Sequence, residues 1–246
     1  MRKKAWLMAR TEIRMVFKNR QVKMIPVMII IMTVIFGGVM TFLLISFAPA
    51  DPLLFSSLMN YIMGVVIIML PVMLPILIAA DSIVGEKERH TLTPLLATPL
   101  SDGELLLGKF LTALIPGLLV AYGNLILATV IVNVVVFMLA PHMLLAWPDM
   151  LSLIQALVLP VLFSVLAVGI MVIISGRAST VYEAYQTGGV LILPAMAFAY
   201  SGFLQGTGLN WLIFYVGVVV LIIVDIILYR IAVRLFNRDA LTSRVG

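Results

Sequence analysis

Long apolar stretches separated by short polar segments constrain this sequence more than any other feature. About twenty consecutive apolar residues suffice to cross a bilayer as a helix, and six stretches reach that length. Hydrophobic residues make up 63% of the chain and charged residues 11%, whereas a soluble domain carries about 25% charged residues. The sequence therefore predicts an all-α membrane protein with six transmembrane helices. The predicted spans are residues 24–47, 59–80, 110–140, 151–174, 183–202 and 209–235.

Positive charge is distributed unevenly among the segments that connect these spans. All 16 Lys and Arg residues lie before the first span, after the sixth, in the second and fourth connections, or at the span ends beside them. The first and third connections contain no Lys or Arg, and their acidic residues are Asp51 and Asp149. Because basic residues stay on the cytosolic side, we expect both termini in the cytosol. The net charge of +5 then reflects topology, and nucleic acid is not an expected partner.

Residues 1–23 form a basic amphipathic segment in front of the first span. Apolar residues such as Trp6 alternate there with basic residues such as Arg10 and Arg14. This pattern predicts a helix that lies on the cytosolic membrane surface, with the Trp6 ring at headgroup depth. No linker divides the rest of the chain, so we expect a single transmembrane domain over residues 1–246.

A polar segment, residues 85–108, is predicted to be a loop that connects the second and third spans on the cytosolic side. It is too long for a simple turn, and four leucines in it recur at helical spacing. The segment therefore predicts a short helix with one apolar face, which either lies on the membrane surface or docks into a groove of a cytosolic partner. The leucines are Leu92, Leu95, Leu96 and Leu100.

Residues 103–109 read G-x-x-x-x-G-K, which is the beginning of a phosphate-binding loop. The next residue is Phe110, where that loop requires Ser or Thr for magnesium, and no strand is expected before it. We interpret the match as chance. The chain has no cysteine, its two histidines lie on opposite sides of the predicted membrane, and no set of nucleophile, base and acid can be assembled. The sequence thus predicts no catalytic residue, no metal site and no cofactor bound by this chain.

Three polar residues stand within the predicted spans and are candidates for a translocation pathway. Asp225 lies about midway along the sixth span, where a charged side chain is costly and by default indicates function. Pairing with Tyr229, one helical turn later, or with a basic group near the cytosolic end is the structural alternative. Asn124 and Asn133 lie in the third span, where they either line a polar path or hydrogen-bond across helices.

The polar segment resembles the signature of ABC-2 type transporter permeases. The matching stretches are residues 86–92, 95–101 and 104–109. They correspond to an acidic segment with Thr-Leu, a Leu-Leu-x-x-Pro-x-Ser turn, and a Leu-Gly-Lys sequence that leads into the third span. The resemblance extends to the basic N-terminal segment and to the six-span layout, and it covers nearly the whole chain.

This resemblance implies a half-transporter in the cell membrane, surrounded by membrane lipids. Two such chains, a homodimer or this chain with a relative, would form the pathway. A separate cytosolic ABC ATPase subunit, carrying ATP and Mg²⁺, would dock onto residues 85–108 as a coupling helix, and transport in this family is usually export. The residues implied in ATPase coupling are Glu86, Lys87, Glu88, Arg89, Thr91, Leu92, Leu95, Leu96, Pro99 and Leu100.

Two other functions stay open. A subunit that transmits ATP-driven motion to a partner without moving a solute would carry the same coupling segment. A membrane-embedded lipid-modifying enzyme would require polar catalytic groups clustered at one membrane face, and the sequence indicates no such cluster. Lipids, amphipathic drugs or peptides, and ions are the candidate substrates.

Overall fold

The computed structural model describes residues 2–18, 20–47, 51–89, 101–145, 147–175, 178–190 and 210–235. Throughout these residues the regular structure is helical, which confirms the predicted all-α class. Five helical ranges are long and apolar enough to cross a membrane, as expected for a multi-pass membrane protein. They are Val22–Phe47, Pro52–Glu86, Gly103–Leu139, Met150–Ser175 and Phe214–Val233. Of the predicted fifth span, 183–202, residues 183–190 are helical and the rest lies outside the described residues.

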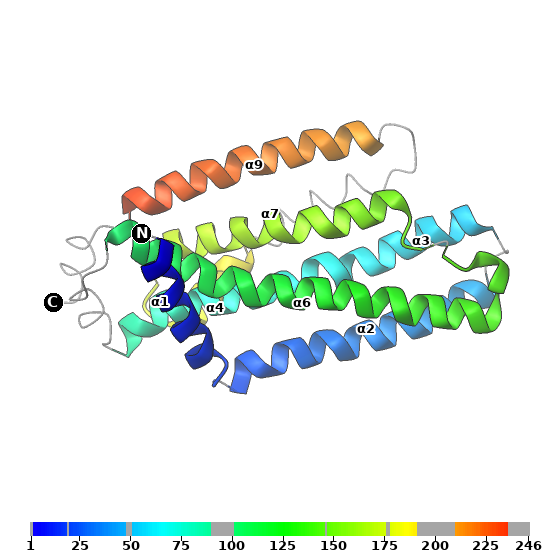
Figure 1. Ribbon diagram of the computed structural model, residues 1–246, viewed down its shortest axis with the longest axis horizontal. Coiled ribbons are helices and arrows are strands. Elements are labelled where there is room, and N and C mark those ends of the chain that lie inside the picture. The colour runs from blue at the N-terminus through cyan, green and yellow to red at the C-terminus, as the bar shows by residue number, and fades with distance from the viewer. Residues whose placement is uncertain are drawn as a thin grey trace.

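Long helices run along the longest axis of the molecule, and a short helix crosses them at one end (Figure 1). The short helix is α1 (Arg2–Val16), and the end that it crosses is called the α1 end below. A composite helix joins α3 (Pro52–Gly64), a π-helical turn η1 (Val65–Met69) and α4 (Leu70–Glu88). A 3₁₀ turn, η2 (Pro141–Met143), follows α6. The other long helices are α2 (Arg20–Phe47), α6 (Asp102–Leu139), α7 (Met150–Ser175) and α9 (Asn210–Leu235).

Within the described bundle, α6 lies at the centre, in contact with α1, α2, α4 and α7 (Figure 1). The composite helix is the most buried of the five spanning ranges, and Leu74, Ile76 and Ile78 of α4 have no exposed surface. By contrast, α2 and α9 lie at the outside and expose many apolar side chains, as helices that face lipid do. α9 packs mainly against α7.

The helices continue past the predicted spans at the α1 end. The sequence predicts a loop over 85–108, but α4 continues to Glu88 and α6 begins at Asp102. Ser101 caps α6, because its hydroxyl accepts a hydrogen bond from the Glu104 N–H at 3.3 Å and its own N–H donates to the Glu104 carboxylate at 3.0 Å. α6 has 38 residues and is about 57 Å long, against about 30 Å for the hydrocarbon core. The predicted loop, 85–108, therefore includes residues at both ends that are helical in the structure.

Two other predicted boundaries also differ from the structure. The amphipathic segment predicted over 1–23 is divided, because α1 ends at Val16 and α2 begins at Arg20. At the opposite end of the bundle, the second spanning helix begins at Pro52 rather than at position 59. Asp51 caps this helix, since its carboxylate accepts a hydrogen bond from the backbone N–H two residues later at 2.9 Å.

Candidate functional site

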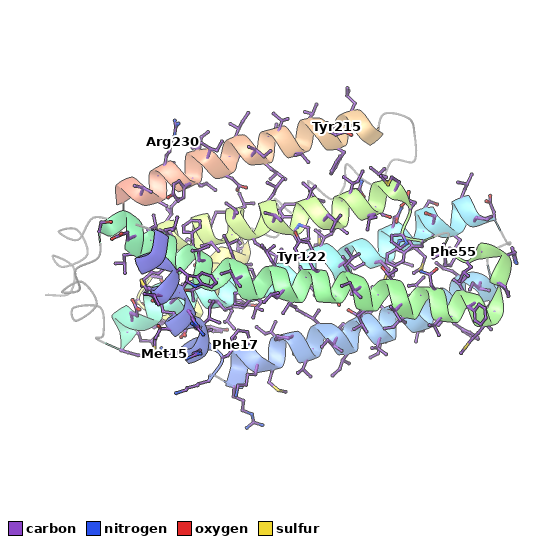
Figure 2. The ribbon with its side chains drawn as sticks, in the orientation of Figure 1. Met15, Phe17, Phe55, Tyr122, Tyr215 and Arg230 are labelled. Carbon is purple, nitrogen blue, oxygen red and sulfur yellow. The ribbon has the colours of Figure 1, made fainter. Side chains whose placement is uncertain are left out.

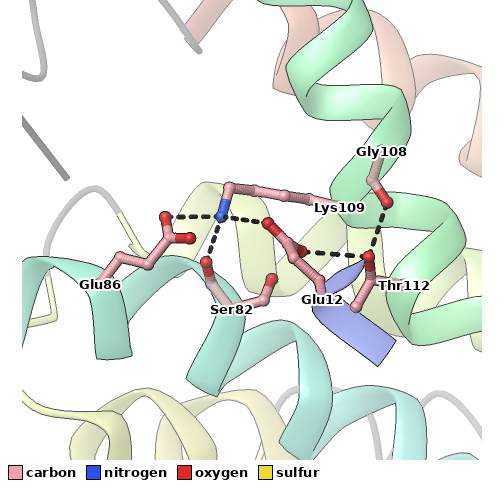
Figure 3. Close-up of polar contacts among 6 residues, drawn as sticks. All are labelled: Glu12, Ser82, Glu86, Gly108, Lys109 and Thr112. Atoms are coloured by element: carbon pink, nitrogen blue, oxygen red, sulfur yellow. Dashed lines mark hydrogen bonds and ion pairs between the residues drawn. The ribbon is translucent and has the colours of Figure 1, made fainter. Parts of the chain in front are cut away.

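A buried lysine joins three helices at the α1 end (Figure 3). The Lys109 ammonium lies 2.7 Å from a carboxylate oxygen of Glu86 and 3.7 Å from one of Glu12, and it donates to the backbone carbonyl of Ser82. Glu12 in turn accepts a hydrogen bond from the Thr112 hydroxyl at 3.1 Å. Because Lys109 is only 1% exposed, protein groups rather than water compensate its charge. We call these five residues the Lys109 cluster.

The cluster brings together four side chains and one backbone carbonyl, that of Ser82, from segments that are far apart in the sequence. Glu12 comes from α1, Ser82 and Glu86 from the last turns of α4, and Lys109 and Thr112 from the first turns of α6. On α4, the Ser82 carbonyl and the Glu86 carboxylate, one helical turn apart, both contact the lysine. The polar segment 85–108, predicted to contain a coupling helix, overlaps the end of α4 and the start of α6 in the sequence. The cluster therefore fastens both of its flanking helices to each other and to α1.

Two further contacts hold the end of α4. The Arg89 guanidinium pairs with the Asp81 carboxylate at 2.7 Å, although Arg89 is 60% exposed. The Glu88 carboxylate accepts a hydrogen bond from the Val181 N–H at 3.2 Å. Val181 begins the helical residues 181–190, and a carboxylate near a helix N-terminus is favoured by the unpaired N–H groups there. The end of α4 is thus in contact with α1, α6 and the segment that follows α7.

The structure describes part of the predicted ATPase-coupling set. Glu86 takes part in the Lys109 cluster, whereas Glu88 and Arg89 are exposed. Lys87 lies on α4, but its side chain is outside the described residues. Contact between any of these residues and an ATPase stays a prediction. Also outside the described residues are Thr91, Leu92, Leu95, Leu96, Pro99 and Leu100.

Asn124 is buried within α6 and links three elements. Its side-chain amide donates to the Val66 carbonyl at 2.9 Å, and its side-chain oxygen accepts from the Thr33 hydroxyl of α2. Val66 lies in the π turn, where its carbonyl would accept from the N–H five residues later. That residue is Pro71, which has no N–H. Asn124 thus satisfies a carbonyl that the proline leaves free, as the cross-helix alternative predicts; its place in a translocation pathway stays a prediction.

Asn133 fastens the loop that follows α6 at the opposite end of the bundle. Its side-chain amide donates to the Trp147 carbonyl at 2.8 Å, and its side-chain oxygen accepts from the Leu145 N–H at 2.9 Å. The Trp147 indole N–H donates to Asn60 at 2.9 Å and so ties the loop to α3. These bonds give Asn133 a structural role, and its assignment to a pathway stays a prediction.

Asp225 is buried where α9 packs on α7, with 7% of the residue exposed. Neither of its carboxylate oxygens has a hydrogen-bond partner among the described residues. The predicted alternative of a pair with Tyr229 is therefore wrong. The Tyr229 ring instead packs edge-on against Phe110, with ring centroids 5.7 Å apart. A buried carboxylate without a partner is costly, and this leaves the functional interpretation of Asp225 as a prediction.

The ion pair between Lys109 and Glu12 was not predicted from the sequence. Glu12 is the one acidic residue in the N-terminal segment 1–23, and an isolated acid in a basic helix is a signal for an ion pair elsewhere in the fold. Lys109 ends the G-x-x-x-x-G-K match, but the match is helical and its lysine is paired with Glu86. The contacts of Lys109 thus argue against a phosphate-binding loop independently of the sequence argument.

Comparison with known proteins agrees with the arrangement of long apolar helices. A family model described as ABC-2 family transporter protein matches residues 13–182, which is more than half of the 246-residue chain. A search of curated proteins found no match. The matched range contains α2, the composite helix, α6 and α7, and together with the membrane-spanning ranges it supports a membrane transport permease. The chain therefore belongs to the ABC-2 transporter family.

Proposed function

We propose that this chain is the permease subunit of an ATP-binding cassette transporter, driven by a separate cytosolic ATPase subunit and exporting a substrate across the cell membrane. The observation that carries the proposal is the Lys109 cluster. It joins the end of α4 to the start of α6 through the 2.7 Å pair of Lys109 with Glu86. The segment between these helices resembles the coupling helix of the family. A push on that segment therefore acts on both helices together instead of separating two free ends.

Both helices lead directly into the centre of the bundle. α4 and α6 are packed so closely that a Cβ atom added to Gly117 of α6 would lie 2.2 Å from the ring of Pro75 on α4. Interiors packed at this density transmit displacement rather than absorb it. Movement of the helix ends at the α1 end is thus carried into the spanning part, which alternating access requires.

In this proposal, the ATP-binding site is on a partner protein. The G-x-x-x-x-G-K match lies on a helix, and its Lys109 is buried with Glu86 and Glu12, so it offers no cradle for phosphate. In this proposal, a cytosolic ATPase dimer binds ATP and Mg²⁺, and a second permease chain completes the pathway. Family resemblance is the support for the second chain and for export.

Purification of the full chain from its native membranes in mild detergent tests the proposal. Copurifying proteins are identified, and ATP hydrolysis is assayed. The variant Leu95→Ser/Leu96→Ser removes apolar side chains from the coupling segment. Its matched control, Leu144→Ser/Leu145→Ser, changes two leucines that are 43% and 75% exposed in the loop at the opposite end. A stoichiometric ATPase that is lost only with the first variant supports the proposal. A folded chain that copurifies with no ATPase overturns it.

The structure also decides which charge reversal is informative. Glu86→Lys would place a second cation beside Lys109 inside the cluster, so it would disturb the fold as well as any docking. Glu88→Lys leaves the cluster intact and changes an exposed side chain, whose one described contact is the hydrogen bond from the Val181 N–H. Once an ATPase is identified, stimulation of its activity by candidate substrates separates a transporter from a subunit that only transmits motion.

A further inference from the structure

α1 exposes large apolar side chains although it packs against the bundle. Its buried stripe is formed by Ala9, Glu12 and Val16, and it contacts mainly α6. Other apolar side chains of α1 are exposed. Large exposed apolar side chains indicate a surface that contacts a membrane or another protein. These exposed side chains are Trp6, Leu7 and Met15, which are 50%, 60% and 57% exposed.

The surface of α2 indicates where the membrane begins. Its exposed basic residues end at Lys23, and every exposed side chain from Met24 to Leu43 is apolar. The change from basic to apolar surface therefore falls within the first turns of α2, close to the elbow that joins it to α1. Met15 and Phe17 lie at this elbow (Figure 2). α1 is thus held near the level at which α2 enters the apolar part of the bilayer.

Five basic side chains gather along α1 and the start of α2. All are exposed, and no carboxylate within the described residues forms an ion pair with them. Glu12, the acidic residue nearest to them in sequence, instead contacts Lys109 and Thr112 in the Lys109 cluster. The five, which we call the basic elbow, are Arg10, Arg14, Lys18, Arg20 and Lys23.

We propose that the basic elbow binds the headgroups of anionic lipids in the leaflet on which α1 lies. This inference does not depend on the proposed transport function. Unpaired basic residues at the membrane level attract anionic headgroups, while exposed Trp6 and Leu7 fit the boundary between headgroups and acyl chains. A nucleic acid or an acidic soluble protein would meet the same charges but would leave these apolar side chains in water. A lipid surface satisfies both features at once.

Native mass spectrometry tests the proposal by counting the lipids that the full chain retains after release from nanodiscs. The discs contain phosphatidylcholine with increasing fractions of phosphatidylglycerol. We expect preferential retention of phosphatidylglycerol, and we expect high salt to weaken it because salt screens exposed charges. Arg14→Gln/Lys18→Gln/Arg20→Gln should lower the affinity for phosphatidylglycerol more than tenfold, since each basic residue near an anionic surface contributes about fivefold. Retention of phosphatidylcholine should not change.

Arg230→Gln is the comparison variant for the triple change, because Arg230 is also an exposed basic residue but lies on the outer side of α9, outside the basic elbow (Figure 2). Because it removes a single basic residue, Arg230→Gln should lower the affinity for phosphatidylglycerol by about fivefold at most, which is less than the loss expected for the triple variant. If the triple variant fails to fold, the salt dependence of retention by the unchanged chain decides the question. Equal retention of both lipids by the unchanged chain overturns the proposal. So does a folded triple variant with unchanged preference, or oligonucleotide binding at these residues without any lipid preference.

Discussion

Replacement of Lys109 by methionine should lower the free energy of unfolding by about 3–5 kcal/mol, the cost of removing one partner from a buried ion pair. Methionine keeps most of the apolar stem of lysine, so the substitution mainly removes the charge. The loss of stability comes from the polar groups that remain at the site. The carboxylates of Glu86 and Glu12 and the carbonyl of Ser82 would then face a site that no longer holds a cation.

The geometry places the expected value near the lower end of this range. The Glu86 carboxylate is the nearer partner at 2.7 Å, but its side chain is 19% exposed, so water can reach it once the lysine is gone. Glu12 lies farther away, at 3.7 Å, and it keeps the hydrogen bond from Thr112. We therefore expect about 3 kcal/mol. Adding Glu86→Gln to Lys109→Met should restore about 1–2 kcal/mol, because it removes one of the two uncompensated carboxylates.

Reversible unfolding of the purified chain in mixed detergent micelles measures these differences. Arg89→Met is the matched control, since it also removes the cation of a 2.7 Å pair, formed with Asp81, but from a side chain that is 60% exposed. An exposed pair of this kind contributes about 0.5 kcal/mol. A loss below about 1 kcal/mol for Lys109→Met would refute the reasoning from burial. Equal losses in the two variants would refute it as well.

Three other substitutions test separate features of the bundle in the same unfolding assay. Asp225→Leu should stabilise the protein by about 2 kcal/mol, because it replaces a buried carboxylate that has no partner in the described part of the chain; destabilisation would mean that the carboxylate is satisfied in the native membrane protein. Asn124→Leu should destabilise it by about 2 kcal/mol, because the Val66 carbonyl of the π turn loses the amide that donates to it, whereas the Thr33 hydroxyl keeps the Ile29 carbonyl as a partner; unchanged stability would contradict that role. Gly117→Ala should cost about 1–3 kcal/mol, since its Cβ would lie 2.2 Å from Pro75, whereas Gly123→Ala meets nothing within 4 Å and should be neutral or stabilising; similar effects of the two would argue against tight α4–α6 packing.

Features that are local in the sequence predicted the class and the family. Long apolar runs identify spanning helices by length alone, and the motif over residues 86–109 is continuous. The Lys109 cluster is not local in this sense. Lys109 and Glu86 are 23 residues apart, and Thr112 and Glu12 are 100 residues apart. Which charged groups meet across such distances depends on how each helix is rotated in the bundle, and hydrophobic periodicity of nearly uniform apolar helices does not determine that rotation.

Helix ends were harder to predict than helix positions, and the reason is physical. Hydropathy reports where contact with lipid ends, but a helix ends where its backbone groups find other partners. At the α1 end, the capping box of Ser101 and Glu104 begins α6 several residues before its apolar part. The pair of Glu86 with Lys109 likewise stabilises polar turns of α4 beyond its apolar part. These interactions extend both helices into the segment that hydropathy assigns to a loop.

Glu12 connects the two proposals. An apolar face orients a basic amphipathic helix on the membrane surface, and the contacts of Glu12 with Lys109 and Thr112 fix the rotation of α1 relative to the bundle. Ala9, with no exposed surface, lies on the same buried stripe, and Leu7, which is 60% exposed, lies on the side turned away from the bundle. The contact that orients α1 toward lipid is therefore the one that ties it to the ends of α4 and α6. A change in the lipid contacts of α1 would reach the flanks of the coupling segment through Glu12 and one lysine.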